Sequence, residues 1–136
     1  MRAVLGIGTD ILKKTQIPSE HLREDDPFFL RAYGDAEREE ARRREGREDY
    51  LRGRFSGKEA VFKALHTEGD AVRFSEIEIL TQPGGMPRVV LHGRAKEIAR
   101  QGGIDEILLS LSCDGDYCLA FALAQGRAAV QNEEAP

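Results

Sequence analysis

Two acidic residues, Asp10 and Glu59, are candidates for binding a metal ion. Asp10 follows a short apolar run, Val4 to Ile7, that is typical of a buried strand. A lone carboxylate there is costly to bury unless it is paired or binds a metal. Glu59 lies in the stretch from Arg54 to Leu65, whose spacing of apolar residues predicts a helix. Because Mg²⁺ usually takes one or two carboxylates from a protein and fills its other positions with phosphate and water oxygens, the two residues predict a magnesium site.

The predicted helix also carries cations beside the carboxylate. Arg54 and Lys58 are four residues apart, as are Glu59 and Lys63, so each pair shares a face of the helix. A helix of this kind can hold a polyphosphate together with its metal. The alternative is an ordinary amphipathic helix with solvated salt bridges, and this stretch alone favours that alternative. The apolar stripe next to these charges consists of Leu51, Phe55, Phe62 and Leu65.

The elements that position these residues are predicted from periodicity. Residues 3–8 predict a strand in which Gly6 and Gly8 let a backbone or a ligand come close. The long helix is expected from about Asp49 to His66. The remaining pattern predicts helices at 28–33, 35–44 and 94–101, and two hairpins, 73–80 with 87–91 and 107–112 with 117–124. Within the first hairpin, the alternation predicts that Ile77 and Ile79 point one way and Glu76 and Glu78 the other. The predicted fold class is therefore α+β, a mostly antiparallel sheet packed against one long helix.

Length and composition predict a single domain. The chain has 136 residues, of which 40% are hydrophobic and 32% charged. The domain is expected to span residues 1–125, followed by a polar tail at 126–136. The net charge of −4 gives no reason to expect nucleic acid, and no apolar run is long enough to cross a membrane, so neither is predicted as a partner.

The amino terminus indicates the cellular compartment in which the protein is expected, and the compartment in turn decides how the cysteines are interpreted. The first residues lack the basic region and long apolar core of a signal peptide, so a cytoplasmic protein is expected. In a reducing compartment, Cys113 and Cys118 are expected to pack as small free thiols rather than form a disulfide. A separate run of charges, residues 36–49, predicts a solvated and salt-bridged helix face, with a surface for an acidic partner or for phosphates as the alternative.

Two segments of the chain resemble the signature of holo-acyl-carrier-protein synthases, the short form of the 4′-phosphopantetheinyl transferases. The segments are Gly6-Ile-Gly-Thr-Asp-Ile11 and Arg54-Phe-x-x-Lys-Glu-Ala-x-x-Lys-Ala-Leu65. The stretches 85–93 and 109–114, with the strand 117–124, are similar to the same family. Either half of the signature is weak alone, whereas the two halves at this spacing are specific.

The resemblance implies the 4′-phosphopantetheinyl transferase fold and reaction. A serine hydroxyl of an apo-acyl carrier protein attacks the β-phosphate of coenzyme A, takes the 4′-phosphopantetheine arm and releases 3′,5′-ADP. The resemblance implies that Asp10 and Glu59 bind Mg²⁺, that Glu59 is the base, directly or through a metal-bound water, and that Lys63 meets the pyrophosphate. It also implies a homotrimer with active sites between subunits. The residues that it places against coenzyme A are Arg54, Lys58, Gly85, Pro87 and Ser112.

The chain departs from the family pattern at several positions near the nucleotide. Met86 stands where lysine is usual, Cys113 where histidine is frequent, and His66-Thr-Glu68 where the family has Gly-Thr-Gly. These departures could remove phosphate contacts, because a thiol bonds a phosphate less well than an imidazole does. The alternative function is therefore a protein of the same fold that binds coenzyme A or a carrier protein with weak or no catalysis.

The segment that should meet the carrier protein, residues 13–26, departs furthest. Gln16 stands near an expected arginine, and carboxylates oppose the remaining cations. Like charges across an interface lower affinity and slow association. The hypothesis is a dedicated carrier protein with a less acidic or differently patterned face. The carboxylates concerned are Glu20, Glu24, Asp25 and Asp26.

Overall fold

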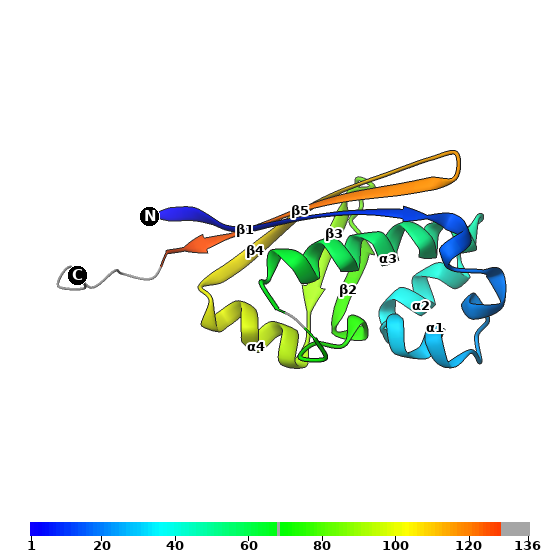
Figure 1. Ribbon diagram of the computed structural model, residues 1–136, viewed down its shortest axis with the longest axis horizontal. Helices are drawn as coiled ribbons and strands as arrows, with labels where there is room; N and C mark the ends of the chain where they lie inside the picture. Colours follow the sequence, from blue (N-terminus) through cyan, green and yellow to red (C-terminus); the bar gives the residue numbers. More distant parts are fainter. Residues whose placement is uncertain (68, 129–136) are drawn as a thin grey trace.

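A long helix lies against two antiparallel sheets in the computed structural model, which describes residues 1–67 and 69–128 (Figure 1). The helix is α3, Arg47–Ala64, close to its predicted bounds. The larger sheet has the order β1-β5-β4, formed by Arg2–Lys13, Tyr117–Arg127 and Ile104–Asp114. The smaller sheet pairs β2, Ile77–Thr81, with β3, Pro87–Leu91. The predicted α+β class is confirmed, although the strands form two sheets rather than one.

The shorter helices flank α3 at its two ends. The helices α1, Pro27–Ala32, and α2, Asp35–Arg42, lie near its beginning, and α4, Gly93–Gln101, lies toward its end (Figure 1). Asp26 caps α1, because its Oδ2 accepts a hydrogen bond of 2.9 Å from the backbone N–H of Phe28. Three short 3-10 turns complete the order: η1, Lys14–Gln16; η2, Ser19–Leu22; and η3, Phe74–Glu76. Within residues 1–67 and 69–128, no helix has the length and apolar character needed to cross a membrane.

The larger sheet presents a face of small residues to α3. A Cβ atom added to Gly8 would lie 2.0 Å from the carbonyl oxygen of Ala60, and one added to Gly6 would lie 2.0 Å from that of Ala64. Helix and strand backbones therefore touch, and only glycine fits at these positions. The predicted close approach at both glycines is confirmed, and the approaching group is backbone. Buried alanines of β5 line the same face: Ala120, Ala122 and Ala124.

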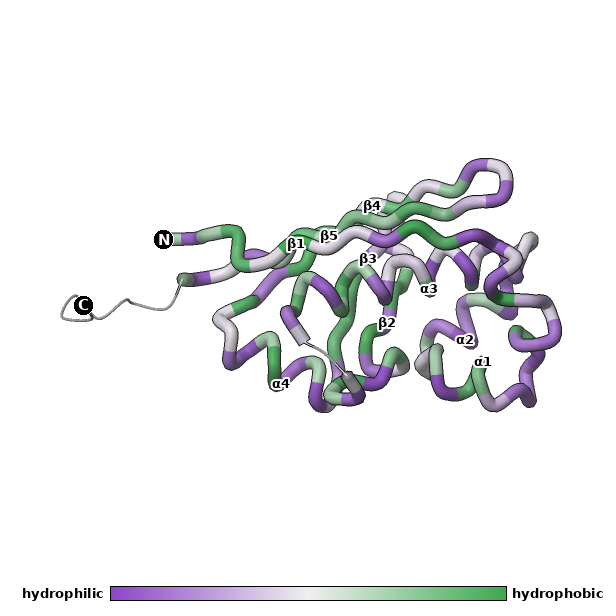
Figure 2. The backbone as a smooth tube through the Cα atoms, in the orientation of Figure 1, coloured by the Kyte–Doolittle hydropathy of each residue, from purple (hydrophilic) through white to green (hydrophobic). Residues whose placement is uncertain are grey.

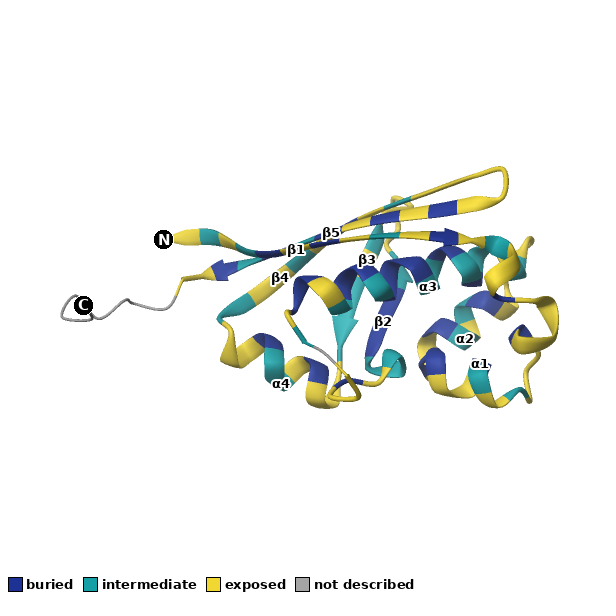
Figure 3. Cartoon of the chain, in the orientation of Figure 1, coloured by how far each residue is buried: buried dark blue, intermediate teal, exposed yellow. Residues whose placement is uncertain are grey.

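The opposite face of this sheet, here called the outer sheet face, is apolar and open. Figure 2 shows long hydrophobic stretches in the strands of this sheet, and Figure 3 shows exposed segments alternating with buried ones along them. Residues paired across antiparallel strands point to the same face, so the exposed apolar side chains gather there. They are Ile7 (58% exposed), Ile11 (66%), Leu108 (49%), Leu119 (51%) and Phe121 (42%).

Two apolar clusters form the core on the other side. One surrounds Val61 and includes Ile77 and Ile79, whose predicted inward alternation along β2 is confirmed. The other surrounds Leu51 of α3 with residues of α1 and η2. The predicted buried stripe of α3 is thus half correct, since Leu51 and Leu65 are buried whereas Phe55 and Phe62 are only partly buried. The reason is that α3 rests on the sheet through its small residues, while these phenylalanines border open cavities.

Cys113 and Cys118 form a disulfide, so the prediction of two free thiols is wrong. The register of the β4–β5 hairpin places the two residues directly opposite each other, with Cα atoms 4.0 Å apart. Opposed side chains on neighbouring antiparallel strands point to the same face and lie within bonding reach. Strand β5 also continues to Arg127, beyond the expected end of the domain at residue 125. The domain boundary stays a prediction, and tail residues 129–136 lie outside the described residues.

Candidate active site

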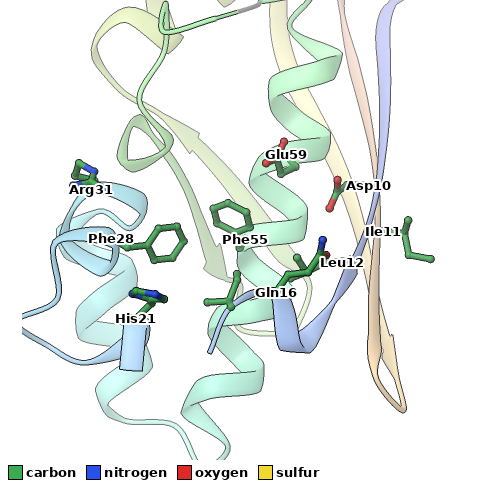
Figure 4. Close-up of a pocket in the computed structure, with 10 residues that line it drawn as sticks. Asp10, Ile11, Leu12, Gln16, His21, Phe28, Arg31, Phe55 and Glu59 are labelled. Carbon is green, nitrogen blue, oxygen red and sulfur yellow. The ribbon is translucent and has the colours of Figure 1, made fainter. Parts of the chain in front are cut away.

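Asp10 and Glu59 line one cavity of about 520 Å³. Asp10 lies on the α3-facing side of β1, where the alternation of the strand puts it in line with Gly6 and Gly8. Glu59 projects from α3, and Figure 4 shows the two carboxylates at the same end of the cavity. The structure therefore brings together two acidic residues that are far apart in the sequence. The rest of the wall is formed by Ile11, Leu12, Gln16, Ile17, His21, Phe28, Arg31 and Phe55.

Two side chains of α3 hold Asp10 in place. The Ser56 hydroxyl donates a hydrogen bond of 3.0 Å to Asp10 Oδ2. The Lys63 ammonium lies 3.7 Å from Asp10 Oδ1 and donates to the carbonyl oxygen of Thr9 at 2.9 Å. Sequence reasoning found Lys63 but missed Ser56, which is fully buried. Ser56 lies one helical turn before Ala60, whose contact with Gly8 is visible only in the structure, so the sequence carried no signal that marked Ser56.

The two carboxylates repel each other in the absence of a cation. Burial raises the pKa of Glu59, the negative charge of Asp10 raises it further, and the Lys63 ammonium opposes both effects. A pair of hard oxygen donors with unbalanced negative charge suits Mg²⁺, which takes one or two carboxylates and completes its shell with phosphate and water. No group of three or more His, Cys, Asp or Glu side chains suited to a metal occurs among the described residues, so the protein's share would be these two.

Replacing Glu59 by Gln is expected to stabilise the metal-free protein near neutral pH. A carboxyl group with a raised folded-state pKa favours folding while protonated, and that contribution is lost as pH rises from its ordinary pKa through the raised one. Glutamine has no such loss. Thermal unfolding in a chelating buffer should therefore give similar midpoints for both proteins below about pH 4 and a higher midpoint for Glu59→Gln at pH 7. A variant that is less stable at pH 7 would contradict the assigned repulsion.

Arg54 belongs to a separate cluster on another face of α3, here called the arginine cluster. Its guanidinium lies 4.3 Å from the ring centroid of Tyr50 and donates to Thr81 Oγ1 at 2.7 Å. Arg44 stacks on the same ring at 4.5 Å and donates to the same hydroxyl at 2.8 Å. Thr81 is paired with Pro87 across β2 and β3, so the predicted turn residues Gly85 and Pro87 lie next to this cluster. Sequence reasoning missed Arg44.

The arginine cluster is suited to anions. Glu40 already supplies one carboxylate to the cluster, since it lies 3.9 Å from Arg54 and accepts a hydrogen bond of 2.9 Å from Thr81 Oγ1. Arg54 Nε is buried there without a hydrogen-bond partner in the described part of the chain. Arginine guanidinium groups commonly bind phosphate through paired N–H donors, although this Nε is itself shielded from solvent. Gly85 has a left-handed backbone, with φ of 91°, which favours glycine in this turn.

Lys58 reaches neither the cavity of Asp10 and Glu59 nor the arginine cluster. Its ammonium is fully buried and bonded to Glu37, which contradicts the predicted contact with coenzyme A. Glu37 in turn is an exception to the predicted solvated face of residues 36–49, since its side chain is also fully buried. The four-residue spacing of Arg54 and Lys58 places them on one helix face, but that face packs against α2 and β2 rather than opening to solvent.

Ser112 lies on a third surface. It is exposed, and its cross-strand partner Leu119 lies on the outer sheet face, opposite to the face that carries Asp10. In one chain, the predicted site residues therefore occupy separate places. Asp10, Glu59 and Lys63 come together; Arg54, Gly85 and Pro87 lie at the end of the β2–β3 hairpin; Ser112 is on the outer sheet face; and Lys58 is in the core.

Comparison with known proteins agrees with this fold. A family model described as the 4′-phosphopantetheinyl transferase superfamily matches residues 6–122, which places the chain among these transferases. A holo-[acyl-carrier-protein] synthase of Desulforudis audaxviator is 39% identical over 130 residues, covering 96% of this chain and 99% of that protein. The chain belongs to the holo-[acyl-carrier-protein] synthase family and is an enzyme of the phosphopantetheinyl transferase class.

Solved structures give the same result. An acyl carrier protein synthase of Plasmodium yoelii with ADP bound superposes with a TM-score of 0.83 and 29% identity, over 93% of this chain and 98% of that chain. The ACPS–CoA complex of Chronobacterium ammoniagenes has a TM-score of 0.76 and 31% identity, over 90% of this chain and 97% of that chain. Coenzyme A is thus a ligand of a protein with the same fold and similar sequence.

Proposed function

We propose that this chain transfers the 4′-phosphopantetheine arm of coenzyme A to a serine of an apo-acyl carrier protein, depends on Mg²⁺, and releases 3′,5′-ADP. Transfer of this arm from coenzyme A to an apo-acyl carrier protein is the general reaction of its family. The observation that carries the finer proposal is the shared cavity of Asp10 and Glu59, with the Lys63 ammonium beside them. A cytoplasmic location stays a prediction.

The residues of the cavity have distinct proposed roles. Asp10 and Glu59 would hold Mg²⁺, which when bound would supply positive charge against the pyrophosphate. Glu59 is also the proposed base for the serine hydroxyl, because its carboxylate lies at the end of the cavity where the reacting groups would meet. Lys63 is free at its exposed end to meet a phosphate oxygen. Ser56 keeps Asp10 oriented and needs no contact with substrate.

We further propose that the enzyme is a homotrimer, because one chain does not bring its nucleotide-binding candidates together. Ser112 and the carboxylates lie on opposite faces of the larger sheet, and Arg54 lies on another face of α3. The outer sheet face exposes a contiguous set of large apolar side chains, as expected of an interface. A neighbouring copy packed on that face would cover it and bring its own Ser112 or arginine cluster toward the cavity.

A charge on the outer sheet face should separate the subunits. Leu119→Glu places a carboxylate among Ile11 and Phe121, where burial in an interface would be costly. We expect a monomer by light scattering and at least a tenfold weaker affinity for coenzyme A, with circular dichroism unchanged. Leu30→Glu, a substitution of an exposed leucine on α1, is the control for oligomeric state. If Leu119→Glu kept the wild-type mass and affinity, the interface would lie elsewhere.

In residues 13–26, the segment proposed to meet the carrier protein, some of the carboxylates are engaged by other groups of the chain. Glu24 is paired with Arg42 at 3.0 Å, and Asp26 caps α1, so two of the four carboxylates are engaged within the chain. Glu20 and Asp25 remain exposed. Arg31, which lines the same cavity on the side opposite to Asp10 (Figure 4), adds a cation that the sequence did not point to. One cation of the segment is engaged as well, since Lys14 is paired with Asp49 at 3.2 Å, so the dedicated-carrier proposal keeps the charge pattern on which the sequence based it.

Mass spectrometry tests the proposed function directly. The protein is mixed with Mg²⁺, coenzyme A and a panel of apo-carrier proteins, and the carriers are examined for the added pantetheine arm. Transfer that a chelator abolishes is the expected result. Saturable binding of coenzyme A without transfer to any partner would favour the binding-protein alternative. Full-rate modification of a standard fatty-acid carrier protein would remove the case for a dedicated partner but leave the enzyme proposal intact.

A further inference from the structure

A buried ion pair joins α3 to α2 one residue before Glu59. Lys58 of α3 and Glu37 of α2 are both inaccessible to solvent, and the Lys58 ammonium donates to Glu37 Oε1. Burial lowers the pKa of Lys58 and raises that of Glu37, so desolvation opposes the charge on both. Such pairs often contribute no more stability than apolar side chains of similar size. Stability alone therefore does not explain the pair.

The hydrogen bonds of the pair are complete. An ammonium has three protons to donate, and Lys58 uses them on Glu37, on the carbonyl oxygen of Phe74 at 2.9 Å and on that of Ile77. Glu37 also accepts from the backbone N–H groups of Gly34 at 2.9 Å and Ile79 at 2.8 Å. No Lys58 proton is left for a phosphate, and the pair ties α3 to α2, η3 and β2.

These bonds fix the rotation of α3 about its axis. On its other side α3 meets β1 at Gly8, where backbone touches backbone, and through the hydrogen bonds of Ser56 to Asp10 and of Lys63 to the carbonyl oxygen of Thr9. The directional bonds of Lys58 anchor the face of α3 that meets α2 and β2, where Ser56 and Lys63 do not reach. Glu59 follows Lys58 and is turned about 100° from it around the helix. A rotation of α3 that broke the Lys58 bonds would therefore also move Glu59 relative to Asp10.

We propose that Lys58 and Glu37 are positioning residues that hold α3 in the rotation that aims Glu59 at Asp10. The inference rests on the proposed function only because it treats these two carboxylates as the reacting site. It replaces the predicted contact between Lys58 and coenzyme A with a role exerted through the adjacent residue. Lys58 then acts on the metal ligands without touching the substrate.

The test removes both buried charges at once. Glu37→Gln with Lys58→Met leaves the net charge unchanged and strands no single charge, so the protein should fold. We expect Mn²⁺, added alone as a paramagnetic substitute for Mg²⁺, to bind about tenfold more weakly by electron paramagnetic resonance. The turnover number should fall at least tenfold while the KM for coenzyme A changes less than twofold. The amides of α3 should exchange hydrogen faster. The control is Glu97→Gln with Arg100→Met, an exposed pair on α4.

Each other outcome is informative. Unchanged Mn²⁺ affinity, turnover and exchange in the double variant would overturn the inference. Unchanged Mn²⁺ affinity with a much larger KM for coenzyme A would also overturn it, because that result indicates a direct phosphate contact. The proposed function would fail if the wild type transferred nothing and showed no Mn²⁺ binding that Asp10→Asn weakens. In that case the rate of hydrogen exchange at the α3 amides would still decide whether Lys58 and Glu37 hold the helix. If the first variant does not fold, Glu37→Leu with Lys58→Met is measured in its place.

Discussion

Asp10→Asn and Glu59→Gln will each lower the rate of phosphopantetheine transfer about a thousandfold, while the protein stays folded. A metal ion supplies several kcal/mol of charge stabilisation to a transition state, and every 1.36 kcal/mol corresponds to a factor of ten in rate. Each substitution removes one of the two carboxylates at the end of the cavity. Quenched-flow or mass-spectrometric rates at saturating Mg²⁺ and coenzyme A measure the effect, and urea unfolding measures stability.

The control for this prediction is a pair of exposed carboxylates on the same sheet. Asp105→Asn with Glu106→Gln removes two negative charges from β4, where they face Arg2 at the surface. That variant should transfer at close to the wild-type rate, since surface pairs contribute little. Ser56→Ala should fall between the two cases, because it frees Asp10 without removing it. If Asp10→Asn and Glu59→Gln lost stability in proportion to activity, the carboxylates would be structural rather than functional.

Gly8→Ala will destabilise the fold by about 3 kcal/mol, at the upper end of the range for overpacked cores. The added Cβ would lie 2.0 Å from the carbonyl oxygen of Ala60, an overlap that only separation of β1 and α3 can relieve. The neighbouring atom belongs to the helix backbone and cannot rotate away. Because Asp10 and Glu59 are carried by those two elements, the same separation should lower the transfer rate even under conditions where the variant remains folded. Urea unfolding gives the stability change.

Gly84→Ala is the matched control for this substitution. An added Cβ at Gly84 meets nothing within 4 Å, so the same chemical change should cost less than about 1 kcal/mol. The comparison separates the steric effect from the general loss of a glycine. A stability of Gly8→Ala equal to that of Gly84→Ala would show that α3 can move away from β1 freely. The close packing of the two backbones would then have no role in positioning the site.

The local pattern of the sequence determined several features correctly. The spacing from Leu51 to Leu65 predicted α3, and the alternation of Ile77 and Ile79 predicted the inward face of β2. Gly6 and Gly8 predicted a close approach. Asp10 and Glu59 were expected to share a site, and they line one cavity, while their metal-binding and catalytic roles stay predictions. The helix and the inward face of the strand were predictable because periodicity within one element decides which side chains share a face.

Tertiary structure alone decided which face meets which partner. Helical spacing put Lys58 beside Arg54, but the packing of α2 and β2 against that face buried Lys58 in an ion pair with Glu37. Strand register paired Cys113 with Cys118, and it turned Ser112 to the outer sheet face. Periodicity within an element fixes the directions of side chains relative to one another. The contacts between elements depend on strand register and packing, which the local sequence pattern does not predict.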